Sequence, residues 1–246
     1  MSIVGVTASS RRQVPNAPTI GTATDVGTDR AFNDGAAVVT FTQSPIGFEA
    51  TSFTITSSPG GYTASGASSP LTVTGLQSNT AYTFTATATN FVGTSTASSA
   101  SNSITATTVP QAPTIGTPTL ATGQAYTGSA NIGVVFTAGA TGGKSITTFT
   151  ATSSSTTVVS GATSPITISE TIGISRNYTV TATNANGTSL VSSASTFITP
   201  SSVPESAPTI GTLSNVTGIA YGSNPQFTLT FEAPTMGATR LWILDR

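Results

Sequence analysis

The sequence predicts an all-β protein made of tandem Greek-key β-sandwiches, two complete copies followed by a partial third. Three observations predict it. The 246 residues suffice for two sandwiches of about 100 residues each plus a remainder. Apolar residues alternate with Thr or Ser, as in residues 39–42 and 82–85, which is typical of half-buried strands. A hexapeptide also recurs at constant spacing, which indicates a repeat.

The composition excludes several classes of function. Charged residues make up only 6% of the chain, against about 25% in ordinary soluble domains, and the net charge is −1. Seven basic residues spread over the whole length do not suit nucleic acid, whose binding depends on neutralising phosphates. No apolar run is long enough for membrane insertion. The apolar residues 1–6 are too short for a signal-peptide core, so we expect no Sec signal.

Residue types needed for common catalytic chemistry are missing. The chain has no histidine and no cysteine, which excludes imidazole-assisted nucleophiles, thiolate chemistry and ordinary zinc sites. The eight acidic residues are scattered, so a paired-carboxylate site has no support. We therefore expect neither an enzyme nor a cofactor.

The repeat itself sets the domain organisation. The hexapeptide Ala-Pro-Thr-Ile-Gly-Thr begins at Ala17, Ala112 and Ala207, with 95 residues between successive copies. A linker containing Val-Pro precedes each copy, and short Pro-containing linkers are fairly stiff. We expect an N-terminal arm (1–13), two full domains (14–108 and 109–202) and a partial third repeat (203–246, strands A to C).

The predicted strands follow the same spacing. Apolar pairs of the second strand recur every 95 residues: Val39 and Phe41, Val134 and Phe136, Leu229 and Phe231. Turn residues such as Pro59-Gly60-Gly61 separate the strands.

These motifs resemble fibronectin type III domains. Leu76 and Tyr82, followed by Ala88-Thr89-Asn90 and Gly93-Thr94, look like the sixth-strand region of that family. The resemblance implies that Tyr82 ties a corner by a hydrogen bond to the chain upstream. The second copy keeps Ile172, Tyr178 and Asn184, but with two residues fewer between tyrosine and asparagine. Phenylalanine stands where the family usually has a second-strand tryptophan.

In its low charge and its short Thr/Ser-rich motifs, the chain resembles repeats in virion proteins of tailed phages and in bacterial surface proteins. This resemblance implies a virion structural protein, either a head decoration or a tail or fibre component. Its role would be a multivalent spacer, a reinforcement or a weak attachment to host glycans, with many copies and homo-oligomeric or virion partners. The alternative is an extracellular bacterial filament or surface adhesion protein.

The third repeat stops near its third strand and would leave an apolar face open. Three alternatives remain: it packs on the second domain or a sister subunit, it accepts a strand from residues 2–7 of a neighbour, or it frays. The candidate assembly residues are Ile3, Val4, Val6, Phe227, Leu229, Phe231, Leu241, Trp242 and Ile243.

A polar cluster lies in the predicted connection between the first two strands. Asp25, Asp29 and Asp34 are candidate ligands of a cation such as calcium, although such residues also favour plain turns. The aromatic residues Phe48, Tyr62 and Phe91 fall near predicted loops, where they either pack or form a sugar-binding face. The Asn-X-Thr triplets, including Asn186, are expected by chance in a chain in which about a fifth of residues are threonine.

Overall fold

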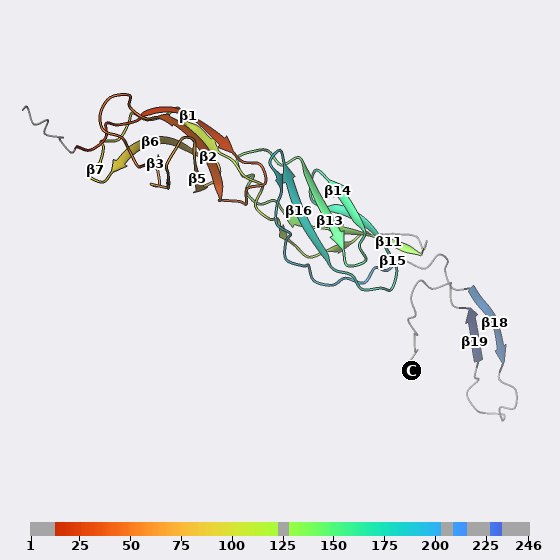
Figure 1. The fold of residues 1–246 in the computed structure, drawn as a ribbon. Coiled ribbons are helices and arrows are strands. Elements are labelled where there is room, and N and C mark those ends of the chain that lie inside the picture. Colours follow the sequence, from red (N-terminus) through yellow and green to blue (C-terminus); the bar gives the residue numbers. More distant parts are fainter. Residues whose placement is uncertain (1–12, 123–127, 203–208, 216–226, 233–246) are drawn as a thin grey trace, which may run out of the picture. The chain divides into compact units, whose positions relative to one another are not determined.

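The computed structural model describes residues 13–122, 128–202, 209–215 and 227–232, the last two ranges by their backbone alone. The described residues form β-strands and no helix (Figure 1). The first repeat contains β1 (Thr19–Val26), β2 (Gly35–Thr42), β3 (Ser52–Ser58), β4 (Thr63–Gly66), β5 (Leu71–Leu76), β6 (Thr80–Asn90), β7 (Gly93–Thr94) and β8 (Ile104–Ala106).

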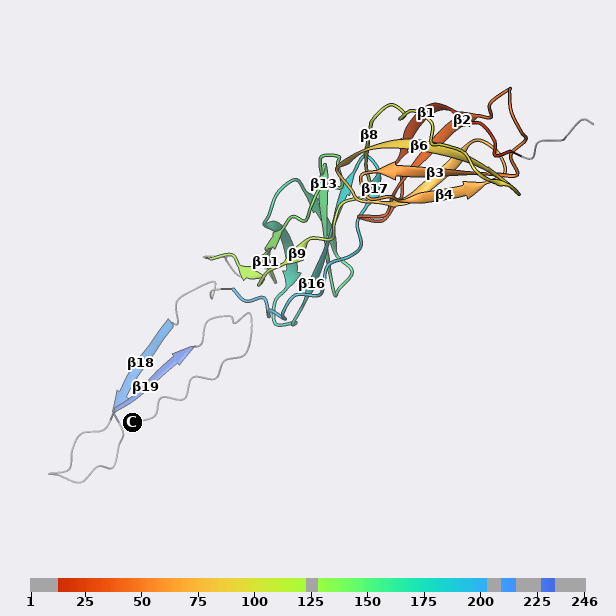
Figure 2. The ribbon, with the colours of Figure 1, turned by 90° about the vertical axis from the view of Figure 1, so that its left-hand side faces the viewer.

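Two antiparallel sheets make up the first repeat (Figure 2). One has the order β1-β2-β5, and the other has the order β4-β3-β6-β7, with β8 pairing to β6. Alternate residues of the facing strands are fully buried between the sheets, including Val39, Ile55, Val73 and Phe84. This arrangement is the Greek-key sandwich that the alternating pattern predicts.

The second repeat has the same sheet order. Its strands are β9 (Thr114–Ile115), β10 (Thr119–Leu120), β11 (Ser129–Val134), β12 (Phe136–Thr137), β13 (Thr148–Ser153), β14 (Val158–Gly161), β15 (Ile166–Thr171), β16 (Tyr178–Asn184) and β17 (Gly187–Thr188). Short strands pair as β10-β11-β15 and β12-β9, opposite the sheet β14-β13-β16-β17.

An aromatic pair marks the same place in both cores. The rings of Phe41 and Phe53 lie 4.8 Å apart, and those of Phe136 and Phe149 lie 4.7 Å apart, both tilted by nearly the same angle. Such pairs stabilise by about 0.5–1.5 kcal/mol beyond their buried area. The protein is therefore a tandem of fibronectin type III-like sandwiches in which phenylalanine fills the second-strand position.

The third repeat begins with the same strand pairing. Strands β18 (Thr209–Asn215) and β19 (Phe227–Glu232) are antiparallel, and their register shifts between Ile210 and Leu213. The register of β1 and β2 shifts between Ile20 and Ala23, the positions 190 residues earlier. The predicted positions Phe227, Leu229 and Phe231 lie on β19, whereas Ile3, Val4, Val6, Leu241, Trp242 and Ile243 lie outside the described residues.

The last strand of each sandwich differs from the expected regular strand. Between β7 and β8 a serine at every third residue replaces the strand ladder. Ser98 donates its backbone N–H to the Ala86 carbonyl (2.9 Å), and its Oγ accepts the Ala86 N–H (2.9 Å). The same hydroxyl donates to the Ser99 carbonyl (2.7 Å). We call this set the serine ladder: Ser95, Ser98 and Ser101 in the first repeat, and Ser189, Ser192 and Ser195 in the second.

The expected tyrosine corner is confirmed in the first repeat. The Tyr82 hydroxyl accepts a hydrogen bond of 3.0 Å from the backbone N–H of Gln77. The ring of Tyr82 is buried and contacts Tyr62 edge-on, with ring centres 6.0 Å apart. Tyr62 is therefore a packing residue of this sandwich.

In the second repeat the sequence alignment on tyrosine is wrong by two residues. The backbone N–H of Tyr178 donates to Ser195 Oγ, which is the ladder bond that Phe84 makes with Ser101 in the first repeat. Tyr178 is therefore the counterpart of Phe84, and its side chain fills the core. Its hydroxyl is buried without a hydrogen-bond partner.

An arginine occupies the corner position instead. Arg176 forms an antiparallel bridge with Ile198, as Tyr82 pairs with Ile104 in the first repeat. Arg176 Nε lies 3.4 Å from Oε2 of Glu170, whose side chain is 3% exposed. An ion pair thus stands in the second repeat where the first has a tyrosine hydroxyl.

Compact units and repeats do not coincide. The first unit comprises Met1–Ala112, Ala138–Thr148 and Ala182–Leu190, and the second comprises Pro113–Thr137, Phe149–Thr181 and Val191–Arg246. Backbone ladders nevertheless stay within each repeat. The domain boundaries at residues 14, 109 and 203 remain predictions.

Candidate functional site

The candidate site is built within the first compact unit, where the turn after β1 meets two loops of the second repeat. These loops are residues 138–147, between β12 and β13, and residues 185–186, between β16 and β17. We call this region the joint. It includes two of the three aspartates that the sequence singles out.

The three candidate carboxylates have separate environments. Asp25 lies inside β1, not in the connection after it as expected, and its carboxylate accepts bonds from the Thr107 N–H (3.0 Å) and hydroxyl (2.5 Å). Asp34 pairs with Arg30 at 2.9 Å on the surface. Asp29 lies in the exposed turn with φ of 56°. Among the described residues no group of three or more His, Cys, Asp or Glu side chains is arranged to hold a metal ion. The cation site remains a prediction.

Asn186 holds the joint from the second repeat. Its backbone carbonyl accepts the N–H of Asp29 at 2.8 Å. Its side-chain amide donates to Thr107 Oγ1 at 2.8 Å and to the Thr108 carbonyl at 3.2 Å. Asn186 is only 8% exposed, so these are buried hydrogen bonds, which are costly to leave unmade.

A second asparagine repeats this role. The Asn184 amide donates to the carbonyls of Thr108 (2.9 Å) and Thr141 (2.8 Å). The N–H of Thr108 in turn donates to the Gly142 carbonyl at 2.8 Å. Thr108 is fully buried, with its N–H, carbonyl and hydroxyl all bonded. The polar groups of Thr108 are therefore all satisfied inside the first compact unit.

Two glycines permit the close approach. A Cβ on Gly142 would lie 2.5 Å from the carbonyl oxygens of Thr108 and Val109, and φ at Gly142 is +71°. A Cβ on Gly27 would overlap Thr107 Oγ1 and lie 2.5 Å from Asn186 Nδ2. Both positions require glycine, because a side chain would separate the hydrogen-bonded groups.

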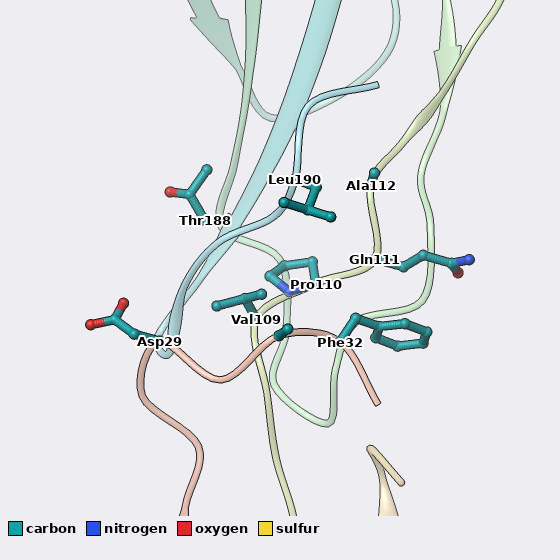
Figure 3. Close-up of a pocket in the computed structure, with 9 residues that line it drawn as sticks. Asp29, Phe32, Val109, Pro110, Gln111, Ala112, Thr188 and Leu190 are labelled. Carbon is teal, nitrogen blue, oxygen red and sulfur yellow. The ribbon is translucent and has the colours of Figure 1, made fainter. Parts of the chain in front are cut away.

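A pocket of about 410 Å³ opens beside the joint (Figure 3). Val109, Pro110 and Leu190 gather at its centre, while the Asp29 carboxylate and the Gln111 amide point outward. Its other lining residues are Ala31, Phe32, Ala112 and Thr188. The lining offers apolar contact and no set of groups for acid–base or nucleophilic chemistry.

Sequence reasoning missed the residues that make the joint. Asn186 was attributed to a chance Asn-X-Thr triplet, yet its amide is committed to two bonds inside the protein. The available signal was the pair Asn184 and Asn186 next to Gly187, directly after the apolar alternation of the strand. That pattern indicates a turn but not what the turn contacts.

The loop aromatics are not brought together as a set. Phe48 is 40% exposed and Phe91 is 75% exposed, whereas Tyr62 packs on the core. Tyr62 is thus a packing residue, and a sugar-binding face in these loops stays a prediction.

Comparisons with known proteins identify no family for this chain. The sequence matches no protein family and no curated protein. Among solved structures, the crystal structure of the chicken CNTN1 FN1-FN3 domains matches with 15% identity and a TM-score of 0.38. The match covers 89% of this chain and 76% of that one. At this level of similarity it carries no argument about activity or partners.

Sandwiches of the fibronectin type III-like class are typically non-catalytic. Within the described residues, no helix is long and apolar enough to cross a membrane.

Proposed function

We propose that the protein is a non-enzymatic virion structural protein of a tailed phage, a head decoration or a tail or fibre component. It acts as a stiff, multicopy spacer that reinforces the particle or attaches it weakly to host glycans. The observation that carries the proposal is the joint, in which Asn186 and Thr108 have their polar groups bonded across two repeats.

The chemistry of the joint suits a mechanical role. The backbone groups of a flexible linker would form hydrogen bonds with water. Here the N–H groups of Thr108 and Val109 donate to the carbonyls of Gly142 and Arg30. Each such bond stabilises by about 0.5–1.5 kcal/mol, and the loss of one leaves a buried partner unsatisfied. A spacer gains from this because a fixed joint carries load without bending.

Composition supports the same role. With 6% charged residues the surface offers little for electrostatic capture of a partner, so attachment through many weak contacts fits better than one tight site. The expected partners are other virion subunits and copies of this chain, and the expected location is the virion.

The location is tested by immunogold electron microscopy with antibodies raised against the purified chain. We expect the antibodies to label the heads or tails of phage particles taken from a culture in which the gene for this chain is present. Labelling of the cell surface with unlabelled particles would overturn the virion role and support the extracellular filament or adhesion protein.

The stiffness is tested by spin labels on Thr24→Cys and Lys144→Cys, two exposed positions of the first compact unit. The natural chain has no cysteine, so these labels are unique. We expect a narrow distance distribution that broadens on Asn186→Ala and stays unchanged on Thr105→Ala, an exposed control. A broad distribution without substitution would contradict the spacer mechanism while leaving the location open.

A further inference from the structure

The asparagine that holds the joint is followed by a glycine. Asn186 is the one asparagine of the 246 residues that has a glycine directly after it. In an Asn-Gly sequence the backbone nitrogen of glycine can reach the side-chain carbonyl carbon of asparagine, because glycine carries no side chain that blocks the approach. This attack is the first step of spontaneous deamidation. The residue that bonds both Thr107 and Thr108 therefore stands in the sequence most prone to that reaction.

The geometry of the joint requires this glycine. A Cβ on Gly187 would lie 2.9 Å from Asp29 Oδ1 and 3.1 Å from Val109 Cγ1, and φ at Gly187 is +132°. A side chain there would push the Asp29 turn away from the Asn186 carbonyl, which accepts the Asp29 N–H at 2.8 Å. The contacts that close the joint thus place an Asn-Gly pair within it.

The closed joint restrains the Asn186 amide. Its Nδ2 donates to Thr107 Oγ1 at 2.8 Å and to the Thr108 carbonyl at 3.2 Å, so both amide hydrogens are used. Deamidation removes Nδ2 from the side chain and therefore requires both bonds to be given up. Asn186 is also 8% exposed, so the water that completes the reaction has little access to it. Gly187 is held as well, because it pairs with Asn184 between β16 and β17.

We propose that Asn186 is a deamidation site that is protected while the joint is closed and that keeps the joint open once it has reacted. The Gly187 nitrogen forms a bond to Cγ of Asn186, the bond from Cγ to Nδ2 breaks, and Nδ2 leaves as ammonia with the proton of the Gly187 N–H. Water then opens the resulting five-membered imide at either carbonyl. The product is aspartate or isoaspartate at position 186.

Neither product can remake the bonds of the joint. The Thr107 hydroxyl already donates its one hydrogen to Asp25, so its oxygen can only accept from residue 186, as the Thr108 carbonyl does. A carboxylate has no hydrogen to give them, and it would lie one hydroxyl away from the Asp25 carboxylate. Burying an unpaired charge beside a like charge is costly.

Isoaspartate also changes the main chain, which then runs through the former side chain. The carbonyl that accepts the Asp29 N–H is then no longer part of the peptide bond to Gly187. One opening of the joint that lasts long enough for the reaction is therefore recorded permanently in that molecule. This inference depends on the joint and not on the virion role.

Peptide mass mapping of the full chain tests the reactivity. The chain is kept in mildly alkaline buffer, once folded and once in denaturant, and the conversion of Asn184 and Asn186 is followed. Asn184 is the matched control, because it is also buried and bonded in the joint but precedes Ala185. We expect Asn186 to convert at least about tenfold faster in denaturant than in the folded chain, and Asn184 to stay unchanged in both. Equal rates for Asn186 in the two conditions, or for both asparagines in denaturant, would overturn the proposal.

Hydrogen exchange tests the consequence. The chain is kept in denaturant until Asn186 has reacted and is then returned to native buffer. The control spends the same time in denaturant at mildly acidic pH, where the Gly187 nitrogen keeps its proton and the reaction is slow. We expect the Asp29 and Thr108 amides to exchange at least about tenfold faster in the reacted chain and to regain their original rates in the control. Asn186→Asp, which supplies one product directly, should behave like the reacted chain. Original exchange rates in the reacted chain or in Asn186→Asp would contradict the proposal.

Discussion

The backbone N–H of Gln77 donates to the hydroxyl of Tyr82 at 3.0 Å, and this bond ties the chain before β6 to the strand itself. The second repeat has no such bond. There Arg176 takes the position of Tyr82 and pairs with Glu170 at 3.4 Å. The neighbouring backbone bond is the same in both repeats: Gly173 N–H donates to the Pro200 carbonyl at 2.9 Å, as Asn79 N–H donates to the Ala106 carbonyl at 2.8 Å. The two sandwiches thus close the same corner with different groups, and the difference is measurable.

Tyr82→Phe should lower the free energy of unfolding by about 1 kcal/mol, because it leaves the Gln77 N–H without its partner. Tyr178→Phe should leave the free energy of unfolding unchanged or raise it, because the Tyr178 hydroxyl is buried without a partner. Denaturant unfolding of both variants checks this. Equal destabilisation by the two substitutions would contradict the assignment of the corner to Tyr82 alone.

Stability should fall at strongly alkaline pH through Tyr178. Burial, and next the negative charge of Glu170, raise the pKa of Tyr178 from 10.0 to about 12. Because this pKa is raised in the folded state, protonated Tyr178 contributes to the free energy of unfolding. The contribution is complete below pH 10 and is lost as the pH rises from 10 to about 12. The loss is on the order of 2–3 kcal/mol. Ultraviolet titration should show a tyrosine that ionises near pH 12, and Tyr178→Phe should remove that step.

Ser→Ala substitutions between β7 and β8 should lower the free energy of unfolding only at the ladder serines, which stand at every third residue. Ser98→Ala removes the acceptor of the buried Ala86 N–H and should lower the free energy of unfolding by about 1–2 kcal/mol. Ser99→Ala changes an exposed side chain and should have an effect within about 0.5 kcal/mol. Ser192→Ala and Ser193→Ala form the same matched pair in the second repeat. Similar effects within a pair would refute the ladder.

The joint should open when Gly27 gains a side chain. Gly27→Ala places a Cβ against Thr107 and Asn186, so the bond from the Asp29 N–H to the Asn186 carbonyl should break. Hydrogen exchange at the Asp29 and Thr108 amides should accelerate by at least tenfold. Thr28→Ala, at the exposed neighbour, should leave both rates unchanged. If the Asp29 and Thr108 amides exchange as slowly in Gly27→Ala as in the natural chain, the joint accommodates the added Cβ without losing these hydrogen bonds, and the prediction is wrong.

Much of the fold is predictable because its signals are local. Alternation of apolar residues with threonine defines the buried faces, and the 95-residue spacing carries even the register shift near Ile20 into the third repeat at Ile210. The corner was misread because Tyr178 stands six residues after Ile172, the spacing from Leu76 to Tyr82, while strand pairing moves it by two positions. A shift of two keeps the side chain on the same face, so the sequence gives no sign of it.

The candidate site was less predictable than the fold. The joint depends on contacts between residues far apart in the chain, such as Asp29 with Asn186, and the local pattern around each residue indicates a turn but not its partner. The serine period of three was visible in the sequence, but it matches neither strand nor helix. Its meaning depends on the neighbouring strand, whose N–H groups the hydroxyls accept.

The serine ladder also determines what the edge of each sandwich presents to a further strand. Proteins commonly use charged edge residues to keep sheets from fusing, and this chain has few charges to place there. Three residues of the last segment span two residues of its neighbour, so an approaching strand with a two-residue period falls out of step after one contact. At this edge of each sandwich a further strand would therefore meet a mismatched border instead of a template for a continuous sheet.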